Sequence, residues 1–165
     1  MSITVFVFGI TGTQGGADAR RLLLQQYGVL AIVRDLNSPA ARSIASLGAK
    51  LFPGHYDDEE SLKDGINGCS AIFLNLSPDF TDKDHELRLA KTILAIAKAA
   101  GVKHVVYTSG MAANEPPRLN YWDPNGPIAR ILLPKQSIER EVRNAGFEKW
   151  TLLRPGFFLT KFPPA

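Results

Sequence analysis

Three glycines spaced three residues apart follow the first apolar segment of the chain, and they constrain its fold more than any other feature. Residues 3–8 form an apolar run that is typical of a short buried strand, and residues 17–26 carry an apolar stripe at helical spacing. Gly9, Gly12 and Gly15 occupy the turn between these two segments. The chain therefore opens with a predicted strand, a glycine-rich turn and a helix.

This arrangement predicts a phosphate site. A turn without side chains lets the backbone come close to an anion, and the start of the following helix aims unpaired amides and a positive dipole end at it. A plain strand-to-helix turn without a ligand is the alternative. The strand before the glycines and the helix after them favour the phosphate group of a dinucleotide.

Composition and charge exclude several classes of protein. A chain of 165 residues, 45% hydrophobic and 21% charged, suits one globular domain. The 19 basic residues are dispersed and the net charge is only +3, which argues against direct nucleic-acid binding. A single cysteine, Cys69, excludes an internal disulfide. With no secretory signal or membrane-length apolar run, we expect a cytoplasmic protein that does not bind a membrane.

Strand and helix signals alternate along the whole chain. The predicted strands span residues 3–8, 29–33, 50–52, 71–76, 102–107 and 150–153. The predicted helices span residues 17–26, 38–47, 57–67 and 84–100, with a last one ending near residue 144 after a loop over 110–127.

The alternation indicates the fold class. Strands that are nearly continuous in apolar residues are covered on both faces, and strand–helix–strand units give right-handed crossovers in a parallel sheet. We expect an α/β fold with a doubly wound parallel sheet, a Rossmann-type three-layer sandwich of about six strands, in one domain over residues 1–165. A ligand is expected at the carboxyl ends of the strands, where the first and fourth strands lie side by side.

Local motifs point to one family. They are Val7-Phe8-Gly9-Ile10-Thr11-Gly12-Thr13-Gln14-Gly15-Gly16, Val33-Arg34-Asp35, Gly54-His55-Tyr56-Asp57-Asp58, Val106-Tyr107-Thr108-Ser109 and Leu153-Arg154-Pro155-Gly156-Phe157-Phe158. Together they resemble the NmrA-like family of atypical short-chain dehydrogenases/reductases over essentially the whole chain. The last motif is the most specific of them.

The resemblance implies a dinucleotide cofactor and the residues that hold it. The pyrophosphate would lie over Gly9, Thr11, Gly12, Gln14 and Gly15. Arg34 would bind the adenosine 2′-phosphate, Asn75 would lie on the nicotinamide side, Thr108 would supply a strand-end hydroxyl, and Lys135 would bind the nicotinamide ribose.

Arg34 also predicts the choice of cofactor from its own chemistry. A guanidinium group offers paired donors to a phosphate, so we expect NADP(H) to be preferred. Asp35, next in the chain, lies about where an acid could bind the free ribose hydroxyl of NAD(H), which therefore stays the alternative. His55 stands where relatives usually carry an aspartate, and we expect an ordinary exposed loop residue there, with stacking beside adenine as the alternative.

The catalytic tyrosine of hydride-transferring relatives is missing. They carry Tyr-x-x-x-Lys, in which the lysine lowers the pKa of the tyrosine so that it passes a proton to a carbonyl. Aligning Lys135 with this lysine puts Ile131 at the tyrosine position. Pro134 predicts a helix that starts or kinks there. Tyr107 and Tyr121 lie in a strand and a loop, which is the wrong placement for the phenol.

No metal site is predicted. The histidines His55, His85 and His104 are scattered, and Asp82, Asp84 and Glu86 read as the acidic start of a helix. Cys69 has no histidine partner in the sequence and fits a small core residue.

Two functions remain open. The first is a redox-sensing or regulatory module that binds NADP(H) with little turnover and acts through a protein partner such as a transcription factor, which would also allow a nuclear location. The second is an NADPH-dependent oxidoreductase of a small carbonyl, quinone or isoflavone-type substrate, with Lys135 as its catalytic group.

The end of the chain carries a last expectation. Family members continue into a smaller lobe that builds the substrate pocket, and we expect this lobe to be truncated or absent here. Its loss would expose an apolar set near the C-terminus, which predicts a homo-oligomer. This set is Phe157, Phe158, Leu159 and Phe162.

Overall fold

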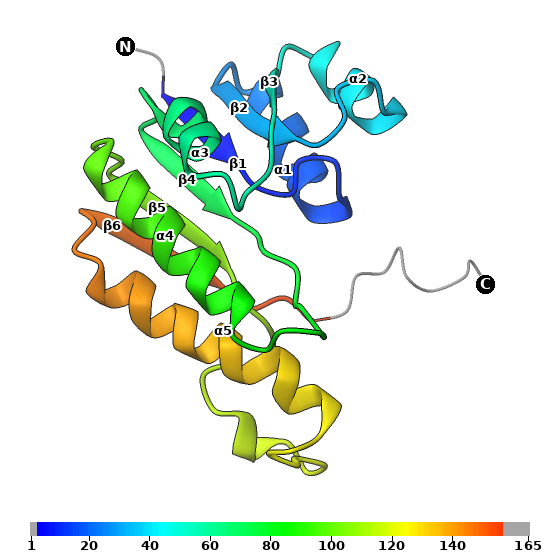
Figure 1. Ribbon diagram of the computed structural model, residues 1–165, viewed down its shortest axis with the longest axis vertical. Coiled ribbons are helices and arrows are strands. Elements are labelled where there is room, and N and C mark those ends of the chain that lie inside the picture. Colours follow the sequence, from blue (N-terminus) through cyan, green and yellow to red (C-terminus); the bar gives the residue numbers. More distant parts are fainter. Residues whose placement is uncertain (1–2, 157–165) are drawn as a thin grey trace.

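The computed structural model describes residues 3–156, which form one parallel six-stranded sheet flanked by helices (Figure 1). The strands are β1 (Thr4–Val7), β2 (Gly28–Val33), β3 (Lys50–Pro53), β4 (Ala71–Leu74), β5 (His104–Thr108) and β6 (Lys149–Leu153). The helices are α1 (Thr13–Leu24), α2 (Pro39–Ala45), α3 (Glu59–Ile66), α4 (His85–Ala99), the short 3-10 helix η1 (Pro116–Arg118) and α5 (Pro127–Asn144). The predicted fold class is confirmed.

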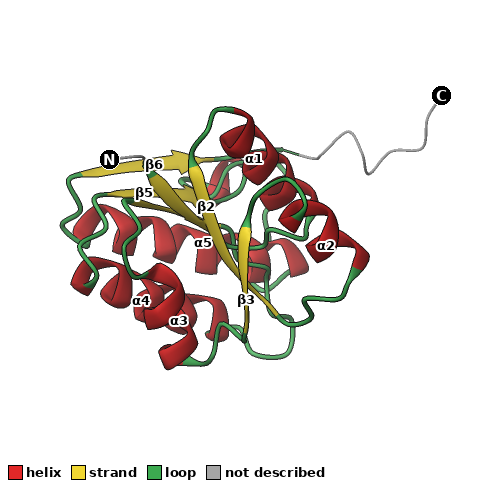
Figure 2. Ribbon diagram, turned by 90° about the horizontal axis from the view of Figure 1, so that it is seen from above, coloured by secondary structure: helices red, strands yellow, loops and turns green. Residues whose placement is uncertain are grey.

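The strand order is β3-β2-β1-β4-β5-β6, and every neighbouring pair is parallel. Helices α1 and α2 cover one face of the sheet, and α3, α4 and α5 cover the other (Figure 2). Strand order reverses between β1 and β4, where Val5 pairs with Ala71. The loops that leave the carboxyl ends of these two strands therefore part and leave room for a ligand.

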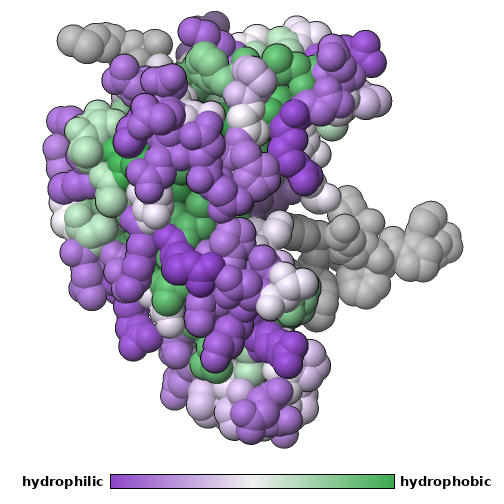
Figure 3. All heavy atoms as spheres, viewed as in Figure 1, coloured by the Kyte–Doolittle hydropathy of each residue, from purple (hydrophilic) through white to green (hydrophobic). Residues whose placement is uncertain are grey.

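Apolar side chains fill both faces of the sheet. On the side of α3, α4 and α5, the core includes Phe6, Ile72 and Val105; on the side of α1 and α2, it includes Val7 and Ala31. The outer sides of α3, α4 and α5 are largely hydrophilic, as Figure 3 shows. Cys69 is buried in the larger cluster, as expected for a small core residue.

One helix start differs from the sequence-based prediction, and one proline lies in an unexpected place. Helix α1 begins at Thr13 instead of residue 17, because the segment from Gly12 already turns helically and the Gly16 amide donates to the Gly12 carbonyl. Helix α5 begins at Pro127, where the predicted loop ends, and Pro134 lies inside it, so of the two alternatives for Pro134, a helix start or a kink, the start is excluded. Proline is well suited to the first turn of a helix, which explains the start at Pro127.

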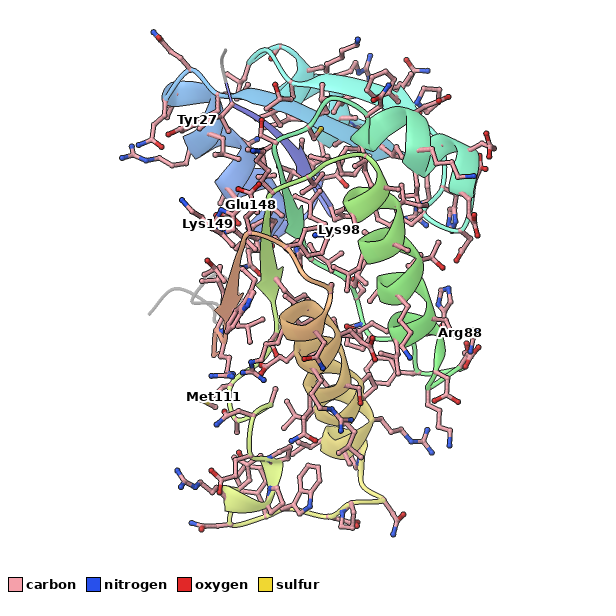
Figure 4. The ribbon with its side chains drawn as sticks, turned by 90° about the vertical axis from the view of Figure 1, so that its left-hand side faces the viewer. Tyr27, Arg88, Lys98, Met111, Glu148 and Lys149 are labelled. Atoms are coloured by element: carbon pink, nitrogen blue, oxygen red, sulfur yellow. The ribbon has the colours of Figure 1, made fainter. Side chains whose placement is uncertain are left out.

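Arg154 anchors the last strand. Its guanidinium donates two hydrogen bonds, of 2.8 and 2.7 Å, to the carboxylate of Glu139 on α5, which is 1% exposed. Lys98 near the end of α4 donates to the carbonyl of Gly146 ahead of β6, in the region where Glu148 and Lys149 lie (Figure 4). Both contacts tie the sheet edge to its covering helices. Across residues 3–156, none of the helices combines the length and apolar character that a membrane crossing requires.

Candidate functional site

The glycine turn lets the backbone at the start of α1 pack directly against the backbone at the end of β1. Gly9 has a φ of +66°, a left-handed conformation that glycine adopts without strain. A Cβ at Gly15 would lie 2.4 Å from the carbonyl oxygen of Gly9, so only glycine lets α1 start this close to β1. A Cβ at Gly9 would approach Nδ2 of Asn75 to 3.2 Å. The first turn of α1 is thus held directly at the end of β1.

The start of α1 is left open to an anion. Its N-cap is Gly12, no side chain accepts a hydrogen bond from its amides, and its first turn holds no acidic residue. Helices α2 and α3 differ, because Ser38 caps the first and Asp58 caps the second. Helix α5 also starts without a side-chain cap, at Gly126, but α1 is the helix that follows the glycine turn. A phosphate bound at that turn would neutralise the positive end of α1.

A cavity of about 510 Å³ opens in front of this helix start, at the carboxyl ends of β1, β2 and β4. It brings together these predicted cofactor residues: Gly9, Thr11, Gly12, Gln14, Arg34 and Asn75. Three predicted residues do not line it. Gly15 packs behind the turn, Thr108 is buried, and Lys135 is buried against Glu86 and Leu76, which line the cavity.

Two residues that follow β2, Arg34 and Asp35, are candidates to bind the adenosine ribose or its phosphate, and they are placed differently. Arg34 lines the cavity. Asp35 does not; its carboxylate accepts a hydrogen bond of 2.8 Å from the amide of Asn37 and so shapes the turn before α2. His55, expected to be an ordinary loop residue, does line the cavity and lies 2.9 Å from a carboxylate oxygen of Asp57.

Tyr56 is a site residue that sequence reasoning missed. Its hydroxyl oxygen accepts a hydrogen bond of 2.8 Å from the amide of Gly9, and its ring packs on Phe8 at 5.0 Å between centroids. Burial raises the pKa of this phenol, although the Gly9 amide and the charge of Arg34 oppose the rise. Its place in the Gly54–Asp58 motif was the available signal.

His85 joins the two loops that border the cavity. Its Nε2 lies 2.9 Å from Asp57, which precedes α3, and its Nδ1 lies 3.0 Å from Asp79, which precedes α4. The hydrogen bond with Asp57 raises the pKa of His85 despite some desolvation, and Asp79 adds to the rise. The same contact lowers the pKa of Asp57. The sequence showed no sign of this bridge, because its members come from separate loops.

A buried ion pair closes the cavity on the side of α4 and α5. Lys135 is 7% exposed and Glu86 is 3% exposed, and the Nζ of Lys135 lies 3.0 Å from Oε1 of Glu86. Lys135 also donates to the carbonyl of Leu76, just after β4, at 3.4 Å. Glu86 lines the cavity. Burial raises the pKa of its carboxyl, and Lys135 opposes that rise.

Neither remaining tyrosine replaces the phenol that Ile131 lacks. Tyr107 is fully buried, its ring lies 5.9 Å from Nζ of Lys135, and burial raises its pKa far above the ordinary range. Tyr121 is exposed in the loop before α5. The hydroxyls of Thr108 and Ser109 are buried and find no hydrogen-bond partner within residues 3–156. Over that same range, His, Cys, Asp and Glu side chains form no cluster of three suited to a metal ion.

Comparisons with known proteins agree with this geometry. A model of the NmrA-like family matches residues 1–164. The NmrA-like family domain-containing oxidoreductase ptmS of Penicillium ochrochloron is 35% identical over 96% of this chain and 48% of its own length. The corresponding oxidoreductase FrzB of Cladobotryum sp. is 33% identical over 98% of this chain and 48% of its own length.

Solved structures show the same fold. Citrobacter sp. triphenylmethane reductase complexed with NADP(H) superposes with a TM-score of 0.73 at 26% identity, over 95% of this chain and 50% of the reductase. NmrA, a negative transcriptional regulator, has a TM-score of 0.75 at 22% identity, over 92% of this chain and 45% of its own. This chain spans about half the length of these proteins. On the match along residues 1–164, the chain belongs to the NmrA-like family.

Proposed function

We propose that this chain is an NADP(H)-binding domain. The observation that carries the proposal is the uncapped start of α1, which opens into a cavity whose far wall holds Arg34. The residues fit the group, because the close backbone packing at Gly15 keeps the phosphate cradle free of side chains. A reductase of similar fold, 26% identical, has been solved as its NADP(H) complex.

Each end of the cavity suits one part of the dinucleotide. The amides at the start of α1, with Thr11, Gly12 and Gln14, would hold the pyrophosphate. Asn75 and the Lys135 ammonium would bind the nicotinamide half. The cofactor supplies hydride transfer when bound. Thr108, whose hydroxyl lacks a hydrogen-bond partner within the described residues, is the remaining candidate for a hydrogen bond to the nicotinamide half.

The end of β2 supports NADP(H) over NAD(H). Arg34 lines the cavity and carries the paired donors that a 2′-phosphate takes. Asp35, the residue suited to accept from a free ribose hydroxyl, does not line the cavity, and one of its carboxylate oxygens accepts from the Asn37 amide in the turn before α2. NAD(H) is therefore expected to bind more weakly.

Little turnover is the second part of the proposal. Ile131 replaces the tyrosine that would pass a proton to a carbonyl, and Tyr107 is buried with a pKa too high for that role. A cofactor-binding chain without a proton donor suits a cytoplasmic redox sensor whose state is read by a protein partner such as a transcription factor. A related fold belongs to a negative transcriptional regulator.

Reduction of a small carbonyl or quinone is the second candidate. It is favoured by the relatives named oxidoreductases and by Lys135, which is buried beside the cavity as a catalytic lysine would be. Steady-state NADPH consumption on a panel of quinones and carbonyls separates the two functions. The sensor predicts no substrate-dependent consumption, whereas a turnover number above about 1 per second would establish the oxidoreductase.

Self-association is proposed on separate grounds. Met111 and Trp150 are 51% and 44% exposed at the β5–β6 side of the domain. The set Phe157, Phe158, Leu159 and Phe162 lies outside the described residues. We expect the chain of residues 1–165 to form a homo-oligomer that covers such apolar side chains. Light scattering over a range of concentrations tests this, and a monomer at the highest concentration contradicts it.

A further inference from the structure

Glu86 combines three properties that a helix-start acid does not need. It is 3% exposed, it borders the cavity, and only one of its carboxylate oxygens has a partner. Oε1 binds Lys135 at 3.0 Å, while Oε2 is buried without a hydrogen-bond partner within residues 3–156. Burying a carboxylate oxygen without a hydrogen bond is costly. Oε2 of Glu86 is therefore suited to accept a hydrogen bond from a bound ligand.

The position of Glu86 decides which part of a dinucleotide it meets. Arg34 directly follows β2, which lies on one side of the central strand β1. Glu86 contacts Lys135 of α5, and Lys135 reaches the carbonyl of Leu76 beyond β4, on the other side of β1. The ligand half that Glu86 meets is therefore the one opposite the adenosine phosphate.

We propose that Glu86 determines affinity for the nicotinamide ribose: Oε1 holds Lys135, and Oε2 accepts a hydrogen bond from a ribose hydroxyl. This inference rests on the proposed NADP(H) function. A ribose offers two neighbouring hydroxyls, and the pair Glu86–Lys135 offers one acceptor beside one donor. Because the terminal torsion of glutamate is soft, a small turn of the carboxyl would present Oε2 to the cavity that Glu86 borders while Oε1 stays beside Lys135.

Two ligands test the proposal by calorimetry. NADP⁺ carries both halves, and adenosine 2′,5′-bisphosphate carries only the half assigned to Arg34. Glu86→Gln should weaken NADP⁺ binding about five- to tenfold, because a charged acceptor is replaced by a neutral amide, and leave the bisphosphate within twofold. The double variant Glu86→Met/Lys135→Met removes both buried charges together and should weaken NADP⁺ at least tenfold.

The control is Asp82→Asn, which also removes one negative charge near the start of α4. Asp82 pairs with Arg88, which lies on the outer side of α4, away from α5 (Figure 4). This variant should bind both ligands as the wild type does. Thermal melting of each variant shows whether it is folded, and the double variant serves where Glu86→Gln alone is not.

The remaining outcomes are distinguishable. Equal loss of both ligands in the Glu86 variants means that the ion pair only supports the fold, and unchanged NADP⁺ binding means that Oε2 meets no ligand; either overturns the inference. A wild type that binds the bisphosphate as tightly as NADP⁺ also overturns it, while leaving the adenosine end of the proposed function intact. A wild type that binds neither ligand refutes the proposed function itself.

Discussion

At the scale of single residues, the glycine turn sets the geometry of the whole site. Gly15→Ala would place a Cβ 2.4 Å from the Gly9 carbonyl oxygen, where rigid backbone must shift. Gly12→Ala meets the same oxygen at 3.2 Å, a milder conflict, at an ordinary backbone angle. We expect Gly15→Ala to lower the free energy of unfolding by about 1–3 kcal/mol and Gly12→Ala by less. Equal losses in urea denaturation would show that the packing at Gly15 is not tight.

The site residues that could be predicted from sequence are those that directly follow a recognisable strand in the chain. The glycines and Arg34 follow strands at regular places, so their common cavity follows from the topology. Glu86 does lie in the first turn of α4, as predicted, but its burial on the same helix face as Ala90 and Ile93 was not predicted. A charge in an apolar stripe was the available signal. For Tyr56 the Gly54–Asp58 motif was the available signal, but its contact with the Gly9 amide exists only in the folded chain.

At the scale of elements, α5 contains an unfavourable residue. Pro134 lies inside the helix, where a proline removes a backbone hydrogen bond and costs about 3 kcal/mol relative to alanine. Proline also reduces the conformational entropy of the unfolded chain, and this offsets part of the cost in the folded helix. Pro134→Ala should raise the free energy of unfolding by about 1–2 kcal/mol, measured by urea denaturation. Pro127→Ala, at the helix start, should change it little; a stability loss in Pro134→Ala would contradict this account.

The bridge between the loops before α3 and α4 predicts a pH dependence. The pKa of His85 is raised, chiefly by its hydrogen bond with Asp57, so its stabilising charge is present below its ordinary pKa of about 6.5 and is lost as the pH rises through the raised value. The pKa values of Asp57 and Asp79 are lowered, so their contribution is lost only as the pH falls below about 4. The bridge is therefore strongest between about pH 4 and 6.5.

Melting temperatures measured from pH 5 to 8.5 test this bridge. The difference between wild type and His85→Gln should be largest near pH 5 and shrink toward pH 8.5. His104 is a useful comparison, because burial lowers its pKa and its effect on stability has the opposite sign. A difference that stays constant with pH would show that His85 is not charged in the bridge.

At the scale of the whole molecule, the alternation of apolar strands and helices was enough to predict the sheet, its parallel strands and the position of the cavity. The start of α1 was placed too late, because Gly12 and Gly15 read as a loop when the close approach to β1 is unknown. The start of α5 at Pro127 agrees with the predicted end of the loop at residue 127, but Pro134 lies inside the helix against its own preference.

At this scale the central proposal is that the cavity binds NADP(H) and that Arg34 binds its 2′-phosphate. Calorimetric titration of NADP⁺ and NAD⁺ into the wild type and Arg34→Ala tests it most directly. A charged contact is worth about 1.5–3 kcal/mol, so Arg34→Ala should weaken NADP⁺ about ten- to a hundredfold and leave NAD⁺ unchanged. Equal loss for both cofactors, or no preference for NADP⁺ in the wild type, would contradict the claim.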